Sequence, residues 1–282
     1  MLQAKEYVRP SSLEEAYQLC RRRSSVVAGG MMWLKMENIP KQTIIDLSGL
    51  GLEGIEEDEE KFSIGAMTTL RMLETHQGLN REFDNIFKEC TRHIVGVQFR
   101  NGATVGGSIY GRFGFSDLLT CFLALDAYVE LYYGGVMPLA EFAAIPRSVT
   151  ERNILVRIMI KKDKRKALYR TVRRSSTDFP LIACCVARKG EKWYISVGAR
   201  PGRAQVAEIE AFGDAASRGT ASRATDFRKE EGTEEDWRKQ EAERIAEEGA
   251  AAFSYGSNLR ASGEYRRILA ETLIKRLAEQ LV

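Results

Sequence analysis

Histidine is scarce in this chain: its 282 residues include only His76 and His93. Two histidines leave little material for imidazole-based catalysis or a multi-histidine metal site, and we interpret both as structural. The five cysteines are Cys20, Cys90, Cys121, Cys184 and Cys185. No pair of them has C-x-x-C spacing, so the sequence supports neither a zinc site nor a cysteine-ligated iron–sulfur cluster. We expect buried, reduced thiols.

Long apolar runs and an excess of one charge are also missing. No run approaches the roughly 18 residues that a membrane helix needs, and residues 1–10 lack the apolar core of a secretory signal. We therefore expect a cytoplasmic protein. Its 42 basic and 39 acidic side chains give a formal net charge of +3, which offers no electrostatic argument for nucleic acid. The length favours two domains.

The hydrophobic pattern predicts mixed helices and strands. Residues 10–20 have the pattern of a helix start with Ser11 as its cap. Short strands at 25–28 and 43–47 complete a small α/β unit. Further strands are predicted at 62–66, 128–133, 154–160, 169–174, 183–187 and 193–197. Helices are expected after a cap at Thr68 or Thr69, and over 116–125. The last helix is expected to bury the face formed by Tyr265, Ile268, Leu269, Leu273 and Leu277.

A basic run at Lys161–Lys166 marks the predicted domain boundary. We interpret the run as a solvated linker, with a phosphate or partner patch as the alternative. The two domains would be 1–165, with subdomains of about 1–55 and 56–165, and 166–282. Residues 213–232 are mostly charged or small and are expected to include a mobile loop.

Two glycine pairs are the strongest functional candidates. Gly29-Gly30 directly follows a predicted strand, and Gly106-Gly107 ends the stretch Arg100–Gly107. A diphosphate needs several converging backbone N–H groups and no Cβ atoms in the way, which glycines provide. Thr104 and Ser108 add hydroxyl donors beside the second pair. Neither pair matches G-x-G-x-x-G or the P-loop pattern, and an isolated Gly-Gly is more often an ordinary turn.

The wider context of these turns resembles the FAD-binding medium subunits of the xanthine dehydrogenase and carbon monoxide dehydrogenase family of molybdenum hydroxylases. Ala28–Leu34 matches the A-G-G-x-x-x-L turn of that family, and Arg100–Ser108 matches its R-N-x-A-T-x-G-G turn. Ser116-Asp117 and then Leu123–Ala127 follow where the family has an aspartate and an alanine–leucine–aspartate–alanine stretch. The resemblance continues beyond the basic run, at Tyr169–Ser175, Asp178–Leu181, Gly198–Pro201 and Ser262–Arg267.

The resemblance implies an α+β fold and FAD as the cofactor. A vanillyl-alcohol-oxidase-type FAD-binding domain of two α/β subdomains would be followed by a C-terminal domain with an antiparallel sheet and helices. The implied cofactor-binding residues are Val27, Ala28, Gly29, Gly30, Met31, Met32, Thr104, Val105, Gly106, Gly107, Ser108, Asp117, Leu155 and Arg170. No catalytic or metal-binding residue is implied in this chain.

Six of these residues have individual implied roles or depart from the family pattern. Asp117 would accept a hydrogen bond from the adenosine ribose or a neighbouring group, and Leu155 would pack near the flavin. Arg170 stands where the family often has lysine; it would either place positive charge near the isoalloxazine or form a structural ion pair. Ser108 stands where Asn or Asp is usual. Met31 and Met32 likewise replace small or polar residues, without removing any backbone N–H group.

The resemblance further implies a division of labour between subunits. A molybdopterin-binding large subunit would hydroxylate the substrate, and a small subunit with two [2Fe-2S] clusters would pass electrons to the FAD of this chain. NAD would be one final acceptor. The alternatives are a stand-alone flavin-dependent oxidoreductase of the same fold, and a scaffold subunit that has lost its flavin.

Overall fold

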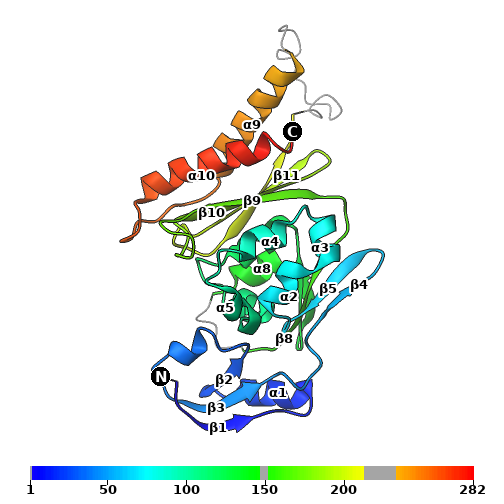
Figure 1. Cartoon of the computed structure of the whole chain (residues 1–282), viewed down its shortest axis with the longest axis vertical. Helices are drawn as coiled ribbons and strands as arrows, with labels where there is room; N and C mark the ends of the chain where they lie inside the picture. Colours follow the sequence, from blue (N-terminus) through cyan, green and yellow to red (C-terminus); the bar gives the residue numbers. More distant parts are fainter. Residues whose placement is uncertain (1, 147–151, 213–232) are drawn as a thin grey trace.

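Three separate sheets follow one another along the chain and along the long axis of the molecule (Figure 1). The computed structural model describes residues 2–146, 152–212 and 233–282. The predicted loop at 213–232 therefore lies outside the described residues. Each sheet carries its own apolar core, and the candidate site lies where the three parts meet.

The first sheet has three parallel strands in the order β1-β3-β2. They are β1 (Ala4–Val8), β2 (Ser25–Ala28) and β3 (Lys41–Asp46), and the α-helix α1 (Leu13–Cys20) packs against them. The strand β1 was not predicted. The cap of α1 is Ser12, whose hydroxyl accepts from the Glu15 amide. The prediction of Ser11 was wrong by one residue, because Ser11 binds the Glu15 carboxylate instead.

The second sheet has five antiparallel strands in the order β4-β5-β8-β6-β7. The strands are β4 (Ile55–Glu57), β5 (Lys61–Gly65), β6 (Tyr128–Leu131), β7 (Gly135–Pro138) and β8 (Leu155–Lys161). The helices between β5 and β8 are α2 (Leu70–Thr75), α3 (Gln77–Glu82), α4 (Ile86–Thr91), α5 (Val97–Gly102), α6 (Val105–Tyr110), α7 (Asp117–Ala124) and α8 (Leu139–Ala144). The cap of α2 is Thr69, one of the two predicted candidates.

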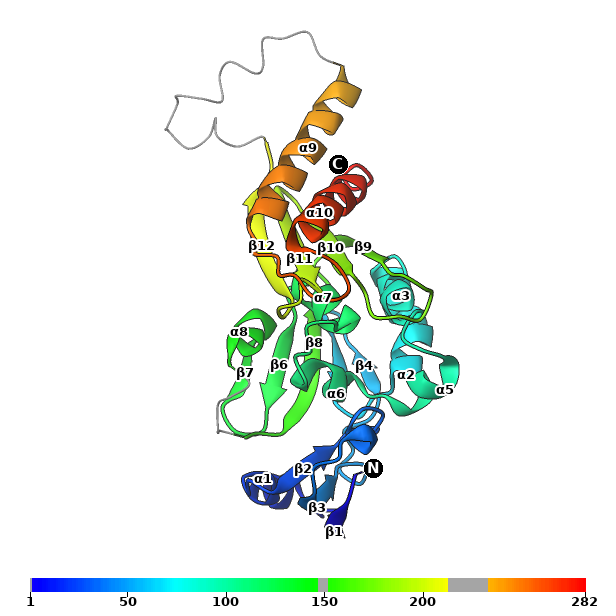
Figure 2. The ribbon, with the colours of Figure 1, turned by 90° about the vertical axis from the view of Figure 1, so that its left-hand side faces the viewer.

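The third sheet is antiparallel in the order β12-β11-β10-β9 (Figure 2). It consists of β9 (Lys166–Val172), β10 (Ile182–Lys189), β11 (Lys192–Gly198) and β12 (Gln205–Glu210). Two long helices, α9 (Glu234–Ala251) and α10 (Gly263–Ala278), share its core around Trp193. The strands β10 and β11 also contact α7, whose eight residues are all buried. The helix α7 therefore joins the second and third parts.

Two predictions in this half are wrong in detail. On α10, Tyr265 and Ile268 are exposed, whereas the predicted Leu273 and Leu277 are buried together with Arg266 and Ala270. The basic run is not a solvated linker throughout, because Arg165 is 2% exposed. Its guanidinium donates to the Ala124 carbonyl, pairs with Asp163 and lies 3.9 Å from the centre of the Tyr194 ring.

Candidate functional site

A cavity of about 400 Å³ lies where the three parts of the molecule meet. Its wall includes Gly29 to Leu34 from the loop after β2, and Thr104 and Gly106 to Ser108 from the start of α6. The third part supplies residues that follow β9, among them Phe179. The volume falls in the range of about 300–1,000 Å³ that is usual for small-molecule and cofactor sites.

The two glycine turns are in direct contact with each other. A Cβ atom on Gly29 would lie 2.5 Å from Thr104 Oγ1 and 3.7 Å from the Cα atom of Gly107. A Cβ atom on Gly30 would lie only 1.2 Å from the Gly102 carbonyl oxygen. Glycine is therefore required at 29 and 30 because the turns pack closely. The structure brings the two predicted segments together.

The two turns differ in the backbone N–H groups that they offer. In the second turn, Val105 donates to Thr68 O at 2.8 Å, Gly106 donates to Ala66 O at 2.8 Å, and Gly107 donates to Thr104 Oγ1 at 3.1 Å. The amides of Gly30, Met31 and Met32 donate no hydrogen bond within the described ranges. The first turn therefore holds the backbone amides that are free to donate to a ligand, and the second turn forms the close-packed surface beside them.

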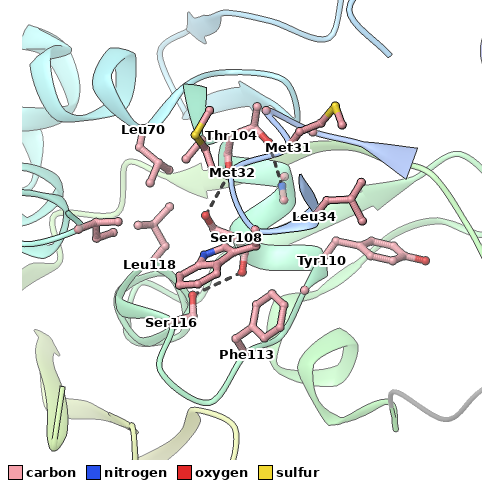
Figure 3. Close-up of a pocket in the computed structure, with 18 of the residues that line it drawn as sticks. Met31, Met32, Leu34, Leu70, Thr104, Ser108, Tyr110, Phe113, Ser116 and Leu118 are labelled. Atoms are coloured by element: carbon pink, nitrogen blue, oxygen red, sulfur yellow. Dashed lines mark hydrogen bonds between the residues drawn. The ribbon is translucent and has the colours of Figure 1, made fainter. Parts of the chain in front are cut away.

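Figure 3 shows how the side chains beside the two turns are held. The Thr104 hydroxyl caps α6 by accepting from the Gly107 amide, so its own proton stays available to a ligand. The Ser108 hydroxyl donates to the Thr104 carbonyl at 3.0 Å. Met32 packs against Gly102 and the core of the second part. Met31 has a φ of 59°, a left-handed conformation that is unfavourable for a non-glycine residue.

Asp117 lines the cavity wall at the start of α7, but its carboxylate is already engaged. It accepts a short hydrogen bond from the Tyr169 hydroxyl and pairs with Arg173 at 2.5 Å. Burial raises the pKa of Asp117, which the positive charge of Arg173 opposes, and burial raises the pKa of Tyr169 well above its usual value. These contacts tie α7 to the third part of the molecule.

The other predicted residues divide between the cavity and its surroundings. Val27 and Leu155 line the cavity, whereas Ala28 and Val105 are buried outside the lining. The structure does not bring Arg170 to the cavity. Its side chain is 53% exposed and pairs with Glu89 at 3.6 Å, which is the structural ion pair of the two predicted roles.

Several lining residues were not predicted. Phe113, Phe115 and Phe179 form a group of rings with Trp33, and Arg173 occupies the cavity wall in place of Arg170. The sequence carries one signal for this group, the closely spaced aromatic residues of the Phe113-Gly114-Phe115 segment. His93, interpreted as structural, also lines the cavity, with Nδ1 3.2 Å from Ser176 Oγ.

The described residues contain no group of three or more His, Cys, Asp or Glu side chains that could hold a metal ion. All five cysteines are buried and free, as predicted. Within the same ranges, no helix combines the length and the apolar composition needed to span a membrane.

An apolar cavity with two glycine turns in its wall suits a ligand that carries a phosphate bridge. The fold and the site together define a dinucleotide-binding α+β protein. The family model described as "FAD binding domain in molybdopterin dehydrogenase" matches residues 2–161, and the chain belongs to this family. The family resemblance, the fold class and FAD as the cofactor are thereby confirmed.

Similar proteins extend this comparison beyond the matched domain. The chain is 25% identical over 295 residues to the nicotine 6-hydroxylase medium subunit of Paenarthrobacter nicotinovorans, covering 98% of this chain and 96% of that subunit. It is 29% identical over 189 residues to the uncharacterized protein YgfM of Escherichia coli K12, covering 64% of this chain and 69% of that protein.

Solved structures share the fold at lower identity. A chain of Cu,Mo-CO dehydrogenase is 22% identical with a TM-score of 0.78, covering 100% of both chains. A chain of quinoline 2-oxidoreductase from Pseudomonas putida 86 is 21% identical with a TM-score of 0.75, covering 98% of this chain and 96% of that one.

Proposed function

We propose that this chain is the FAD-carrying medium subunit of a molybdenum hydroxylase complex. It would take electrons from the [2Fe-2S] clusters of a small partner subunit and pass them to NAD or another acceptor. A molybdopterin-binding large subunit would hydroxylate the substrate. The observation that carries the proposal is the cavity whose wall brings Thr104 together with Gly30 to Met32, whose amides donate no hydrogen bond within the described ranges.

The residues at the cavity fit the dinucleotide. The three free amides would donate to the diphosphate, and the Thr104 hydroxyl would add a fourth donor. Gly107 leaves room for close approach, because a Cβ atom there would meet only Thr104 Oγ1 within 4 Å. Leu155 and Val27 would supply apolar contacts. Bound FAD supplies the electron-carrying chemistry, and the protein supplies binding, orientation and electrostatics.

Two carboxylates of the wall are engaged in structural contacts, which supports a carrier role. The Asp117 carboxylate is held by Tyr169 and Arg173, and the Asp178 carboxylate by Arg260 at 2.7 Å. A general base must be free to reach a substrate proton. The near full-length similarity to a nicotine 6-hydroxylase medium subunit supports the same conclusion.

The test is to purify the chain, load it with FAD, remove free flavin and record its visible spectrum. We expect flavin bands and, under anaerobic conditions, bleaching by NADH but not by N-heterocyclic substrates added alone. A colourless protein in excess FAD would indicate the scaffold alternative. Bleaching by an organic substrate without partner subunits would indicate the stand-alone oxidoreductase. Bands that NADH leaves unchanged would point to another acceptor.

A further inference from the structure

A group of aromatic rings forms part of the cavity wall. The Trp33 ring lies 5.5 Å from the Phe179 ring at an interplanar angle of 25°, and 5.7 Å from the Phe115 ring. Phe99 meets Trp33 edge-on at 6.1 Å, and Phe113 stacks on Phe115 at 5.2 Å. Because Trp33 comes from the first part, Phe115 from the second and Phe179 from the third, the rings connect all three.

Trp33 differs from the other rings in how much of it stays uncovered. Its side chain belongs to the cavity wall and remains 39% exposed, although Phe179 packs on the indole. A large aromatic surface left uncovered beside a cofactor cavity is suited to stacking against a flat ring. The indole also follows the free amides of Gly30 to Met32 by one residue, so a ligand held there has its ring portion within reach of Trp33.

The other lining residues differ in their chemistry. Cys20, Leu47 and Ile154 belong to the apolar core of the first part. Tyr110 is engaged, because its hydroxyl accepts from the Asn153 amide and its ring packs on Phe142 at 5.7 Å. Arg173, which pairs with Asp117, and Thr177 also line the cavity and are close to Phe179 in the chain. Polar groups beside stacked rings suit the isoalloxazine, which has carbonyl oxygens along one edge of a flat tricycle.

We propose that Trp33 is the stacking platform for the isoalloxazine ring of FAD, and that Phe179 and Phe115 hold the indole in position. This inference rests on the proposed function, since it requires that FAD is bound. Trp33 acts as a positioning residue: it fixes the ring that exchanges electrons and takes no part in proton transfer.

The experiment measures the fluorescence of each bound flavin and the dissociation constant for FAD in two variants, Trp33→Leu and Trp33→Phe. An indole in contact with an excited flavin quenches its emission by transient electron donation, whereas leucine and phenylalanine do not. We expect emission to rise several-fold in both variants. Binding should weaken by about two- to tenfold in Trp33→Leu, the loss of one aromatic stacking contact, and by less in Trp33→Phe, which keeps a ring.

Trp237→Leu is the matched control, because Trp237 is 41% exposed on α9 and does not line the cavity. It should leave emission and affinity unchanged. If Trp33→Leu and Trp33→Phe behave like this control while all forms bind FAD, the inference is wrong and the proposed function stands. Tighter binding in Trp33→Leu would also overturn it, since the indole would then occupy the space of the ring. Failure of the unmodified chain to bind FAD would reject both proposals.

Discussion

Gly30 and Gly107 both line the cavity, but a side chain would have different effects at the two positions. At Gly30 it would collide with the Gly102 carbonyl, so loss of FAD in such a variant would reflect a damaged turn. At Gly107 it would point into nearly open space, with only Thr104 Oγ1 nearby, at 3.1 Å. Gly107 is therefore the position at which cofactor binding can be tested separately from folding.

We expect Gly107→Val to weaken FAD binding by about ten- to a hundredfold, the effect of crowding a close-packed site by 1–3 kcal/mol. The cofactor-free protein should keep its melting temperature, because valine is no worse than glycine within a helix. Gly96→Val is the control: Gly96 caps α5 and is not itself part of the cavity lining, and a Cβ atom there meets only Gln98 Oε1, at 3.4 Å. Isothermal titration with FAD and thermal melts of both variants provide the measurement. If Gly107→Val and Gly96→Val bind FAD with equal affinity, the diphosphate does not approach Gly107.

The placement of Arg170 shows what sequence patterns can establish for a single residue. Side chains alternate along a strand, and Tyr169 is the kind of residue that a sheet buries, so Arg170 must face the other way. The outward position of Arg170 could therefore be predicted from the sequence. The position of Arg173 could not, because it lies beyond the end of β9, where the alternation no longer applies. Only the contact with Asp117 shows that Arg173 points inward.

At the scale of elements, α7 and β9 are joined by a buried hydrogen bond between Asp117 and Tyr169. The folded protein holds the Tyr169 pKa well above its ordinary value of about 10, chiefly through burial. A group whose pKa is raised by folding makes its full contribution to stability at pH values below its pKa in the unfolded chain. That contribution is lost as the pH rises through its pKa in the folded protein. The link between α7 and β9 should therefore weaken in alkali.

We expect Tyr169→Phe to lower the free energy of unfolding by about 1–3 kcal/mol at neutral pH, because Asp117 loses a buried donor. The difference from the unmodified chain should shrink above pH about 10, where ionisation of Tyr169 already opposes folding. Urea unfolding at about pH 8 and about pH 10.5 measures both effects. Tyr265→Phe, at a 48% exposed position on α10, serves as the control and should show neither. If the difference in the free energy of unfolding stays constant with pH, the conclusion that ionisation of Tyr169 weakens this link is wrong.

Helices and strands whose hydrophobic residues recur at a regular spacing were mostly predicted, and the exceptions have physical reasons. The strands β9, β10, β11 and β6 follow from the predicted alternation, whereas β12 was not predicted. The buried face of α10 was misplaced because it contains Arg266, which a hydrophobic pattern assigns to solvent. The Arg266 guanidinium donates to the carbonyl groups of Leu181, Gly256 and Ala261, and such contacts between distant segments leave no signal in the local sequence.

At the scale of the whole molecule, the cavity draws its wall from all three parts, which has a thermodynamic consequence. A ligand that binds only the folded form stabilises it by RT ln(1 + [L]/Kd). FAD at about 100 times its Kd should therefore add about 2.7 kcal/mol, and raise the melting temperature by roughly 5–10 °C for a chain of this size.

Scanning calorimetry across an FAD titration measures this shift. FMN, which lacks the adenosine portion and the second phosphate, should produce a smaller shift at the same concentration. Equal shifts with FMN would show that the part of the ligand beyond the first phosphate makes no contact. The size of the effect follows from the assembly of the wall, which could not be predicted from the sequence. The sequence marks the two turns, but only the packing of the sheets shows that Phe179 closes the same cavity.

The two turns use their backbone amides differently: those of the second turn hold the fold together, and those of the first turn are left to bind the cofactor. The hydrogen bonds donated by the Val105, Gly106 and Gly107 amides hold α6 in its place, so only a change that breaks these bonds would disturb the frame of the protein. The amides of Gly30, Met31 and Met32 form no such bonds within the described ranges. Gly30 must stay glycine and Met32 packs against the core, so Met31 is the position at which a side chain can be exchanged to adjust how tightly the nucleotide is retained. Cofactor retention in this protein can thus be tuned independently of its scaffold.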